Sequence, residues 1–135
     1  MAIIKKKYDK VGYITKELAK KVGFSYTGEV YLSPGAKKHI LKKHGRDLGR
    51  YISENLTQAL EKIISHPDYI GVHPKKEKQS IELIKRIGKN ILVAIEVDLE
   101  ENYIYVSSMY PITKSKLENR IGSGRVIRHA RKRHS

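Results

Sequence analysis

Hydrophobic residues in the first half of the chain recur at helical spacing. Leu56, Leu60 and Ile63 fall on one stripe, which predicts a helix over residues 53–65. Pro67 ends this helix, because proline disfavours the helical conformation in the residue before it. The stripe is typical of a helix that packs one apolar face against a core.

Capping residues predict a shorter helix nearer the N-terminus. Thr15 can accept a hydrogen bond from a free backbone N–H of the first turn, and Gly23 can take the left-handed conformation that ends a helix. These two residues predict a helix over residues 15–22. An extended segment, residues 28–32, is expected after it.

A third helix is predicted over residues 36–44. Ser33 can cap it, and Pro34 fits the first turn, where no N–H donor is needed. Gly45 is the expected C-terminal cap of this helix.

In the second half of the chain the pattern becomes alternating, which predicts strands. The connections between these strands are too short to hold a crossover helix, so the strands should pair as an antiparallel meander. Thr113 is expected to cap a last short helix. The four predicted strands cover residues 68–73, 80–87, 90–98 and 102–109.

These elements predict an α+β fold in which N-terminal helices pack on a four-stranded antiparallel meander sheet, followed by a short C-terminal helix and a basic tail. Residues 1–27 would form an N-terminal helical extension. Residues 28–121 would form the main domain, and residues 122–135 a flexible basic tail.

Composition narrows the function classes. The chain has 135 residues, a net charge of +14 and no cysteine, which excludes disulfide scaffolds and thiol chemistry. It shows no signal peptide and no apolar stretch long enough to span a bilayer, so we expect a soluble, cytoplasmic protein with no membrane partner. A strongly cationic surface attracts polyanions, and nucleic acid is the first candidate.

The densest group of candidate catalytic residues lies on the predicted helix over residues 36–44. His39 and Lys43 share a helical face, whereas His44 lies nearer the apolar side and should point toward the sheet. Imidazole titrates near neutral pH, so two histidines beside several cations suit acid–base work on a phosphodiester. A single histidine on a basic helix is more often an ordinary surface residue.

A second candidate cluster follows the fourth predicted strand. Ser108, Tyr110 and Thr113 supply hydroxyl groups, and Lys114 and Lys116 supply ammonium groups. Such groups can hold a phosphate or stabilise the charge on its oxygens during transfer. Serine, threonine and proline also populate turns for purely local reasons.

Other mechanisms fit the sequence poorly. There is no glycine-rich phosphate loop and no nucleophile elbow. There is also no persuasive carboxylate cluster for magnesium, so we expect neither a metal site nor a cofactor. Cleavage without metal favours RNA, because its 2′-hydroxyl can act as the nucleophile. 

Basic residues along the chain are candidates for phosphate contacts. The last sixteen residues contain no acidic side chain, which is typical of a segment that binds polyanions. The predicted nucleic-acid-binding residues are Lys42, Arg46, Lys114, Lys116, Arg125, Arg128, Arg131, Lys132 and Arg133.

The order of these features resembles the phage and mobile-element nucleases of the barnase/EndoU/colicin/RelE-like (BECR) superfamily. The similarity rests on residues 30–44, on the His-Pro-Asp sequence at residues 66–68 and on residues 107–111. These lie within a span of residues 28–121. It implies helices packed on a four-stranded antiparallel sheet and metal-independent endoribonuclease activity. Members often act as toxins or effectors, which would imply an acidic antitoxin or immunity protein as a partner.

The resemblance also implies roles for the candidate residues. His39 or His44 would transfer the proton, and Lys43 would offset charge on the phosphorane. Tyr110 and Thr113 would orient the phosphate, with Ser108 beside them. The group that deprotonates the 2′-hydroxyl stays open.

Two alternatives to an RNase are compatible with the sequence. The chain could be a non-catalytic nucleic-acid-binding module, whose affinity would fall steeply with salt. It could also be a basic interaction protein that binds an acidic protein partner.

Overall fold

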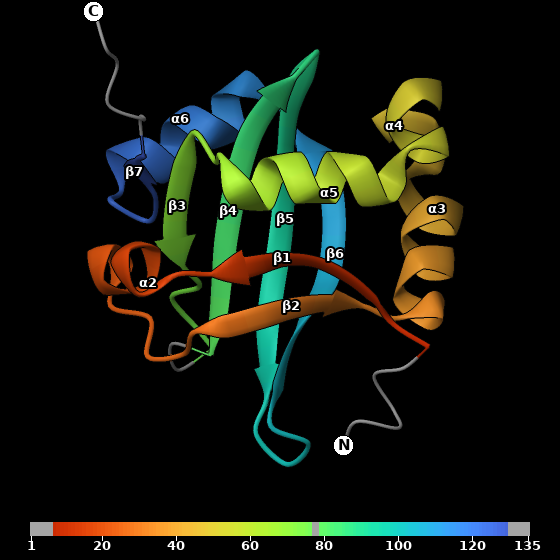
Figure 1. Cartoon of the computed structure of the whole chain (residues 1–135). Coiled ribbons are helices and arrows are strands. Elements are labelled where there is room, and N and C mark those ends of the chain that lie inside the picture. Colours follow the sequence, from red (N-terminus) through yellow and green to blue (C-terminus); the bar gives the residue numbers. More distant parts are fainter. Residues whose placement is uncertain (1–6, 77–78, 130–135) are drawn as a thin grey trace, which may run out of the picture.

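A computed structural model describes residues 7–76 and 79–129 and shows helices around one seven-stranded sheet (Figure 1). The strand order is β1-β2-β6-β5-β4-β3-β7, and every neighbouring pair is antiparallel except β2 and β6. The strands are β1 (Asp9–Ile14), β2 (Gly28–Leu32), β3 (Tyr69–Val72), β4 (Ser80–Ile87), β5 (Lys89–Asp98), β6 (Tyr103–Ile112) and β7 (Ile127–Arg128). The helices are α2 (Lys16–Val22), α3 (Pro34–Leu48), α4 (Arg50–Glu54), α5 (Leu56–Ser65) and α6 (Lys114–Gly122).

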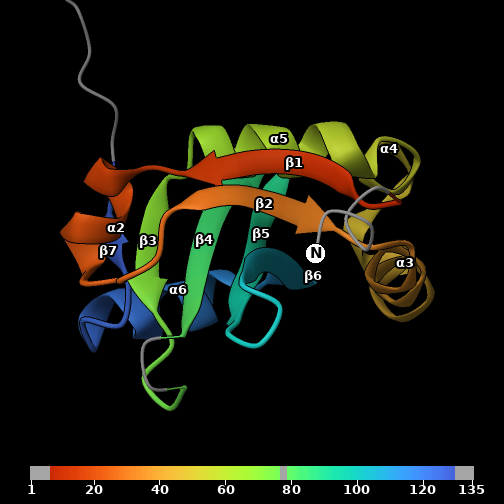
Figure 2. The same cartoon turned by 60° about the horizontal axis from the view of Figure 1, so that its bottom comes forward.

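Helices lie on both faces of the sheet. Helix α5 crosses one face together with the curled pair of strands β1 and β2, whereas α6 lies behind the opposite face (Figures 1 and 2). Helix α3 stands at the side of the sheet next to β6. Within the described part of the chain, none of the helices combines the length and the apolar character that crossing a membrane requires.

The two faces bury two separate apolar clusters. The larger one joins α5 to the face of β5 that carries Ile91, Val93 and Ile95, all fully buried. The smaller one lies under α6, where Leu117 covers Leu92. Burial of this much aliphatic surface is the main favourable term in folding, so both faces of β5 contribute to stability.

The predicted caps of two helices are confirmed. The Thr15 hydroxyl accepts a hydrogen bond from the Leu18 N–H at 3.1 Å, and Gly23 ends α2 in the left-handed conformation. The Ser33 hydroxyl likewise accepts from the Ala36 N–H at 3.0 Å. Local hydrogen bonding decides these helix ends, and local sequence therefore predicts them.

The predicted end of α3 at Gly45 is wrong. The helix continues to Leu48, and the chain leaves it at Gly49, whose φ of 91° suits glycine. Leu48 is buried in the main core, eight residues after the buried Ile40. Burial of this additional apolar residue outweighs the modest helix-breaking tendency of one glycine.

The long helix predicted over residues 53–65 is interrupted in the structure. Asn55, with φ −130° and ψ 43°, separates α4 from α5. The apolar stripe of the prediction is present on α5, where Leu56, Leu60 and Ile63 are all buried.

The fold class is α+β, but the sheet has seven strands where four were predicted. The four predicted strands correspond to β3, β4, β5 and β6, which pair consecutively. Strands β1, β2 and β7 extend this sheet on both sides. Residues 9–14 were assigned to a helical extension, yet β1 pairs with β2, so this segment belongs to the same sheet.

The fourth predicted strand also runs further than expected. β6 continues through Pro111 to Ile112. The strand β2 pairs with β6 only at Ile104 and Tyr105, so β6 has an open edge beyond that point. Proline is tolerated in strands that have a neighbour on only one side.

The C-terminal segment was expected to be a flexible tail from residue 122, and this is corrected by the structure for residues 122–129. Val126 is buried, and β7 pairs with β3. The backbone also passes close over β3, since a Cβ atom at Gly71 would lie 1.9 Å from the Arg125 carbonyl oxygen. Glycine at position 71 therefore permits the docking of this segment.

We expect Gly71→Ala to lower the free energy of unfolding by about 1–3 kcal/mol, because the added methyl group forces the Arg125 backbone away from β3. Urea unfolding followed by circular dichroism measures the change. Gly122→Ala is the matched control, since a Cβ atom there meets nothing within 4 Å. Equal stability of the two variants would contradict this account of the packing.

Candidate nucleic-acid interface and active site

Helix α3 is fixed against the sheet at both ends. Ser33 caps its start, and the buried Ile40 and Leu48 anchor it in the core. The Lys89 ammonium group at the start of β5 donates a 2.7 Å hydrogen bond to the Asp47 carbonyl oxygen. A cation at this position satisfies one of the unpaired carbonyls at the helix C-terminus. The side chains of α3 are thus held in a defined place beside β6.

His44 on α3 faces the sheet and meets Tyr110 on β6. The two ring centroids are 5.4 Å apart, with 35° between the ring planes. Burial lowers the pKa of His44, and the nearby Lys43 lowers it further. His44 therefore stays neutral at pH values where an ordinary histidine begins to protonate, and a neutral imidazole can accept a proton. His39 and Lys43 are both exposed on α3.

Small side chains form the floor of the sheet next to this pair. Ser108 lies on the same face as Tyr110, two residues away on β6, and its partner on β5 is Ala94. Both residues are partly exposed. A bulge interrupts the pairing here, and the Ser107 hydroxyl donates to the Ala94 carbonyl oxygen at 3.2 Å. Bulges of this kind often redirect side chains next to functional sites.

A groove of about 530 Å³ begins at Tyr110 and runs along α6. Three cationic side chains, Lys116, Arg120 and Arg125, line it together with Asn119. The Thr113 hydroxyl accepts a hydrogen bond from the Lys116 N–H at 3.1 Å, and this cap holds the start of α6 at the groove. The groove is thus lined by cationic side chains and leads to the His44–Tyr110 pair.

A buried carboxylate holds the two arginines. Glu82 on β4 has a side chain that is only 2% exposed, and both its oxygens accept hydrogen bonds from the Arg125 guanidinium group, at 3.0 and 2.7 Å. Arg120 Nε lies 3.7 Å from the same carboxylate and has no hydrogen bond to any described residue. One negative charge therefore faces two positive charges, which leaves the groove with a net cationic character.

His73 and Glu96 are candidate proton-transfer groups that sequence reasoning missed. Burial lowers the pKa of His73, and the nearby Arg125 lowers it further. Its Nδ1 accepts a hydrogen bond from the Lys75 N–H at 3.1 Å. Glu96 accepts a hydrogen bond from the Tyr105 hydroxyl and pairs with the Lys76 ammonium group at 2.7 Å.

The alternation of β5 places Glu96 on the face opposite the main core, on the same side as Ala94, so the sequence carried a signal for it. The position of His73 depends on how β3 and the segment around Arg125 come together. No local pattern in the sequence reports this contact.

The predicted nucleic-acid-binding residues fall into four groups. Lys116 and Arg125 line the groove, whereas Arg128 lies on β7 at the far edge of the sheet. Exposed side chains on α3 and at the start of α6 supply further cations: Lys42, Arg46 and Lys114. Arg131, Lys132 and Arg133 lie outside the described residues.

This arrangement can bind a phosphodiester and move a proton. The guanidinium and ammonium groups of the groove match phosphate oxygens, and neutral His44 can accept a proton beside them. Among residues 7–76 and 79–129, no three histidine or carboxylate side chains gather in a way that would hold a metal ion.

Comparison with known proteins gives one family. The family model described as phage-Barnase-EndoU-ColicinE5/D-RelE like nuclease matches residues 9–119, which include β1 through most of α6. No significant match was found among curated proteins or solved structures. The matched span contains His44, Glu82 and Tyr110, and it ends just before Arg120.

We expect Glu82→Gln to lower the free energy of unfolding by about 3 kcal/mol or more, because it leaves two largely buried guanidinium groups without a counter-charge. Chemical unfolding at neutral pH tests this. In the exposed pair of Arg50 and Glu54, the Glu54→Gln control should cost less than about 1 kcal/mol. A similar loss of unfolding free energy in the two variants would show that the buried network contributes no more to stability than the exposed pair.

We expect the His44 imidazole to titrate below its ordinary pKa in an NMR titration of the folded protein. Lys43→Gln should raise this pKa, because it removes a neighbouring positive charge, and Asp47→Asn should lower it, because it removes a negative one. In the unfolded chain this histidine protonates at its ordinary pKa, whereas in the folded protein its pKa is lower. His44 therefore makes the free energy of unfolding fall as the pH drops through the ordinary pKa of histidine. A lower pKa in Lys43→Gln or a higher pKa in Asp47→Asn would refute the assignment of causes.

Proposed function

We propose that this chain, which belongs to the phage-Barnase-EndoU-ColicinE5/D-RelE like nuclease family, is a metal-independent endoribonuclease. The observation that carries the proposal is the His44–Tyr110 ring pair at the end of a cationic groove. A proton acceptor and a phosphate-binding surface therefore lie side by side on a face that is partly open. Cleavage that relies on such groups alone needs a nucleophile within the substrate, which RNA has and DNA lacks.

The reaction we propose is an internal transfer of the phosphate. Neutral His44 takes the proton of the 2′-hydroxyl, and the 2′-oxygen attacks the adjacent phosphorus. The bond from phosphorus to the 5′-oxygen breaks, and this oxygen takes a proton from solvent, to which the groove is open. The products are a 2′,3′-cyclic phosphate and a free 5′-hydroxyl.

Charge in the groove stabilises the crowded phosphorane. Arg120 and Arg125, held by Glu82, can donate to the equatorial oxygens of the phosphate, and Lys116 adds a third positive charge. Lys43 lies beside His44 and adds to the positive potential. The Tyr110 ring positions the imidazole by contact, and its hydroxyl group can orient the phosphate.

A toxin or phage-effector role is part of the proposal. A chain that cuts RNA inside the cell that makes it must be neutralised until it is needed. Cationic side chains of α3, α6 and the groove offer a surface that an acidic antitoxin or immunity protein would cover.

We expect purified protein to cut a labelled mixed RNA in excess EDTA and to leave 2′,3′-cyclic phosphate ends. His44→Ala should reduce the rate by about 100-fold or more, because it removes the proton acceptor. Gel analysis of the products, with identification of their ends, measures both effects.

His39→Ala is the matched control, since His39 is exposed on the same helix and is not the partner of Tyr110. This variant should retain most of the activity. Wild-type protein should also retain most of its activity on RNA in which one 2′-deoxy substitution lies away from the cleavage site. RNA that shifts on a gel but is never cut would instead favour the binding module. Tight capture of an acidic protein with little affinity for RNA would favour the interaction protein.

A further inference from the structure

Four tyrosines lie together on the sheet face that carries α6, on a part of that face that α6 does not cover. Tyr103 is at their centre, with ring centroids 6.1 Å from Tyr8, 6.4 Å from Tyr31 and 5.5 Å from Tyr105. All four side chains are partly exposed. We call this group the tyrosine platform. None of its members has a role in the proposed cleavage step.

Strand register explains why these rings share a face. Tyr31 on β2 is opposite Tyr105 on β6, where the two strands pair in parallel. Tyr103 lies two residues before Tyr105 on the same strand, so both side chains point the same way. The bulge shifts the alternation of β6 by one residue, so Tyr103 and Tyr105 lie on the same face of this strand as Ser108 and Tyr110.

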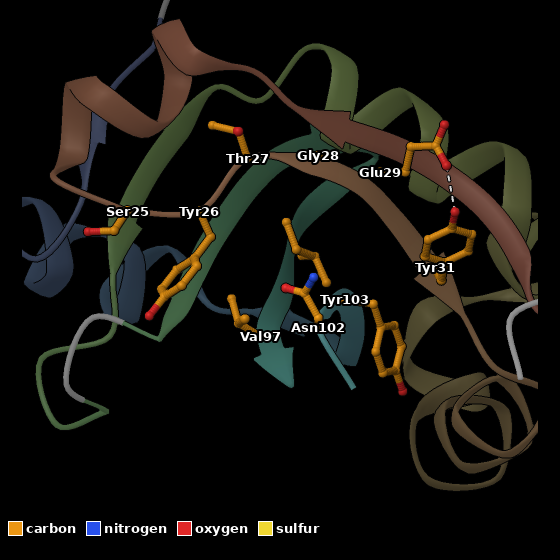
Figure 3. Close-up of a pocket in the computed structure, with 10 residues that line it drawn as sticks. Ser25, Tyr26, Thr27, Gly28, Glu29, Tyr31, Val97, Asn102 and Tyr103 are labelled. Atoms are coloured by element: carbon orange, nitrogen blue, oxygen red, sulfur yellow. Dashed lines mark hydrogen bonds between the residues drawn. The ribbon is translucent and has the colours of Figure 1, made fainter. Parts of the chain in front are cut away.

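A pocket of about 470 Å³ adjoins the platform. Tyr31 and Tyr103 belong to both, and Tyr26 lines the pocket as well. Figure 3 shows the Tyr26 and Tyr103 rings on opposite sides of this pocket, with Asn102 between them. The lining combines aromatic rings with amide and hydroxyl groups and the Glu29 carboxylate, which suits a flat heterocycle better than an anionic group.

The charges around the platform disfavour phosphate and leave the rings for bases. Glu29 and Glu96 lie at its border, each paired with a lysine, at 3.1 Å from Lys10 and 2.7 Å from Lys76. The groove at the other end of β6 instead has three cationic side chains, Lys116, Arg120 and Arg125, and the Glu82 carboxylate offsets only one of their charges. A nucleic acid on this face would place its phosphates at the groove and its bases at the rings.

The hydroxyls of Tyr103 and Tyr105 stay protonated over a wide pH range. Burial, with a smaller effect of the Tyr8 hydroxyl, raises the pKa of Tyr103 to about 12. Burial and the nearby Glu96 also raise the pKa of Tyr105. Tyr103 and Tyr105 therefore carry no negative charge at neutral or mildly alkaline pH.

We propose that the tyrosine platform and its pocket bind unpaired bases of the RNA substrate, which makes the protein selective for single-stranded RNA. This inference rests on the proposed function for the identity of the substrate. Bases in a duplex are stacked on one another and cannot lie on protein rings, whereas every unpaired base has a face that can stack on tyrosine.

The spacing fits one strand of RNA that occupies both sites. Tyr105 lies five residues before Tyr110 on β6, which is about 17 Å at the rise of an extended strand. The platform thus holds bases a few nucleotides away from the phosphate that is cut. Substrate length should matter: fragments too short to reach from the groove to the platform lose the stacking contribution.

The test is binding of a 2′-O-methyl oligonucleotide, which the proposed route cannot cleave. Wild type should bind the single strand and show quenched tyrosine emission, which is easy to read because the chain has nine tyrosines and no tryptophan. Tyr105→Ala and Tyr103→Ala should each weaken binding by about 5- to 100-fold, the usual value of one stacked base. Their RNA cleavage should show a raised KM.

Controls separate stacking from misfolding. Tyr103→Phe retains the ring and should bind within about threefold of wild type, whereas Tyr51→Ala, on α4 and 66% exposed, should leave binding unchanged. If Tyr103→Ala fails to fold, Tyr105→Ala and the quenching of wild type still test the platform. Lys116→Ala should reduce the salt dependence of binding, while Tyr105→Ala should leave that dependence intact.

The outcomes distinguish this inference from the proposed function. Equal affinity for single strand and duplex, or wild-type affinity in Tyr105→Ala, would overturn the platform even if RNA is cut. Ring-dependent binding of the single strand without any RNA cleavage would support the platform and refute the endoribonuclease.

Discussion

The buried carboxylate of Glu82 is the interaction on which the arrangement of the site depends. Glu82 projects from β4 into the space between the sheet and the C-terminal segment, and there it holds Arg125 through two hydrogen bonds and Arg120 through a longer contact. A buried charge of this kind is costly unless it is paired. The chain therefore has to bring α6 and the segment after it onto this face, and the cationic groove is the result.

The rest of the site lies where α6 leaves the same sheet face partly uncovered. α6 covers Leu92 with Leu117, but the face stays partly open at Ala94 and Ser108, where the side chains are small. Next to this floor, α3 supplies His44 from the side of the sheet. A proton acceptor, a cationic channel and an open floor thus come from three elements that are far apart in the sequence and share one sheet face.

The tyrosine platform extends this view to the other end of β6. A single strand carries Tyr103 and Tyr105 at one end and Tyr110 at the other, with a bulge between them. The aromatic end suits bases, and the cationic end suits phosphates. One extended strand can therefore present both kinds of contact to a polymer that lies along it.

Local rules determined much of this protein from its sequence. The caps at Thr15, Ser33 and Thr113, and the four central strands, follow from hydrogen bonding and side-chain alternation within a few residues. The orientation of His44 toward the sheet follows from helical periodicity. The extension of α3 past Gly45, the addition of β1 and the docking of Arg125 on Glu82 required tertiary structure. Each depends on burial or on charge pairing between distant segments, and such contacts gain their free energy only once the sheet has formed.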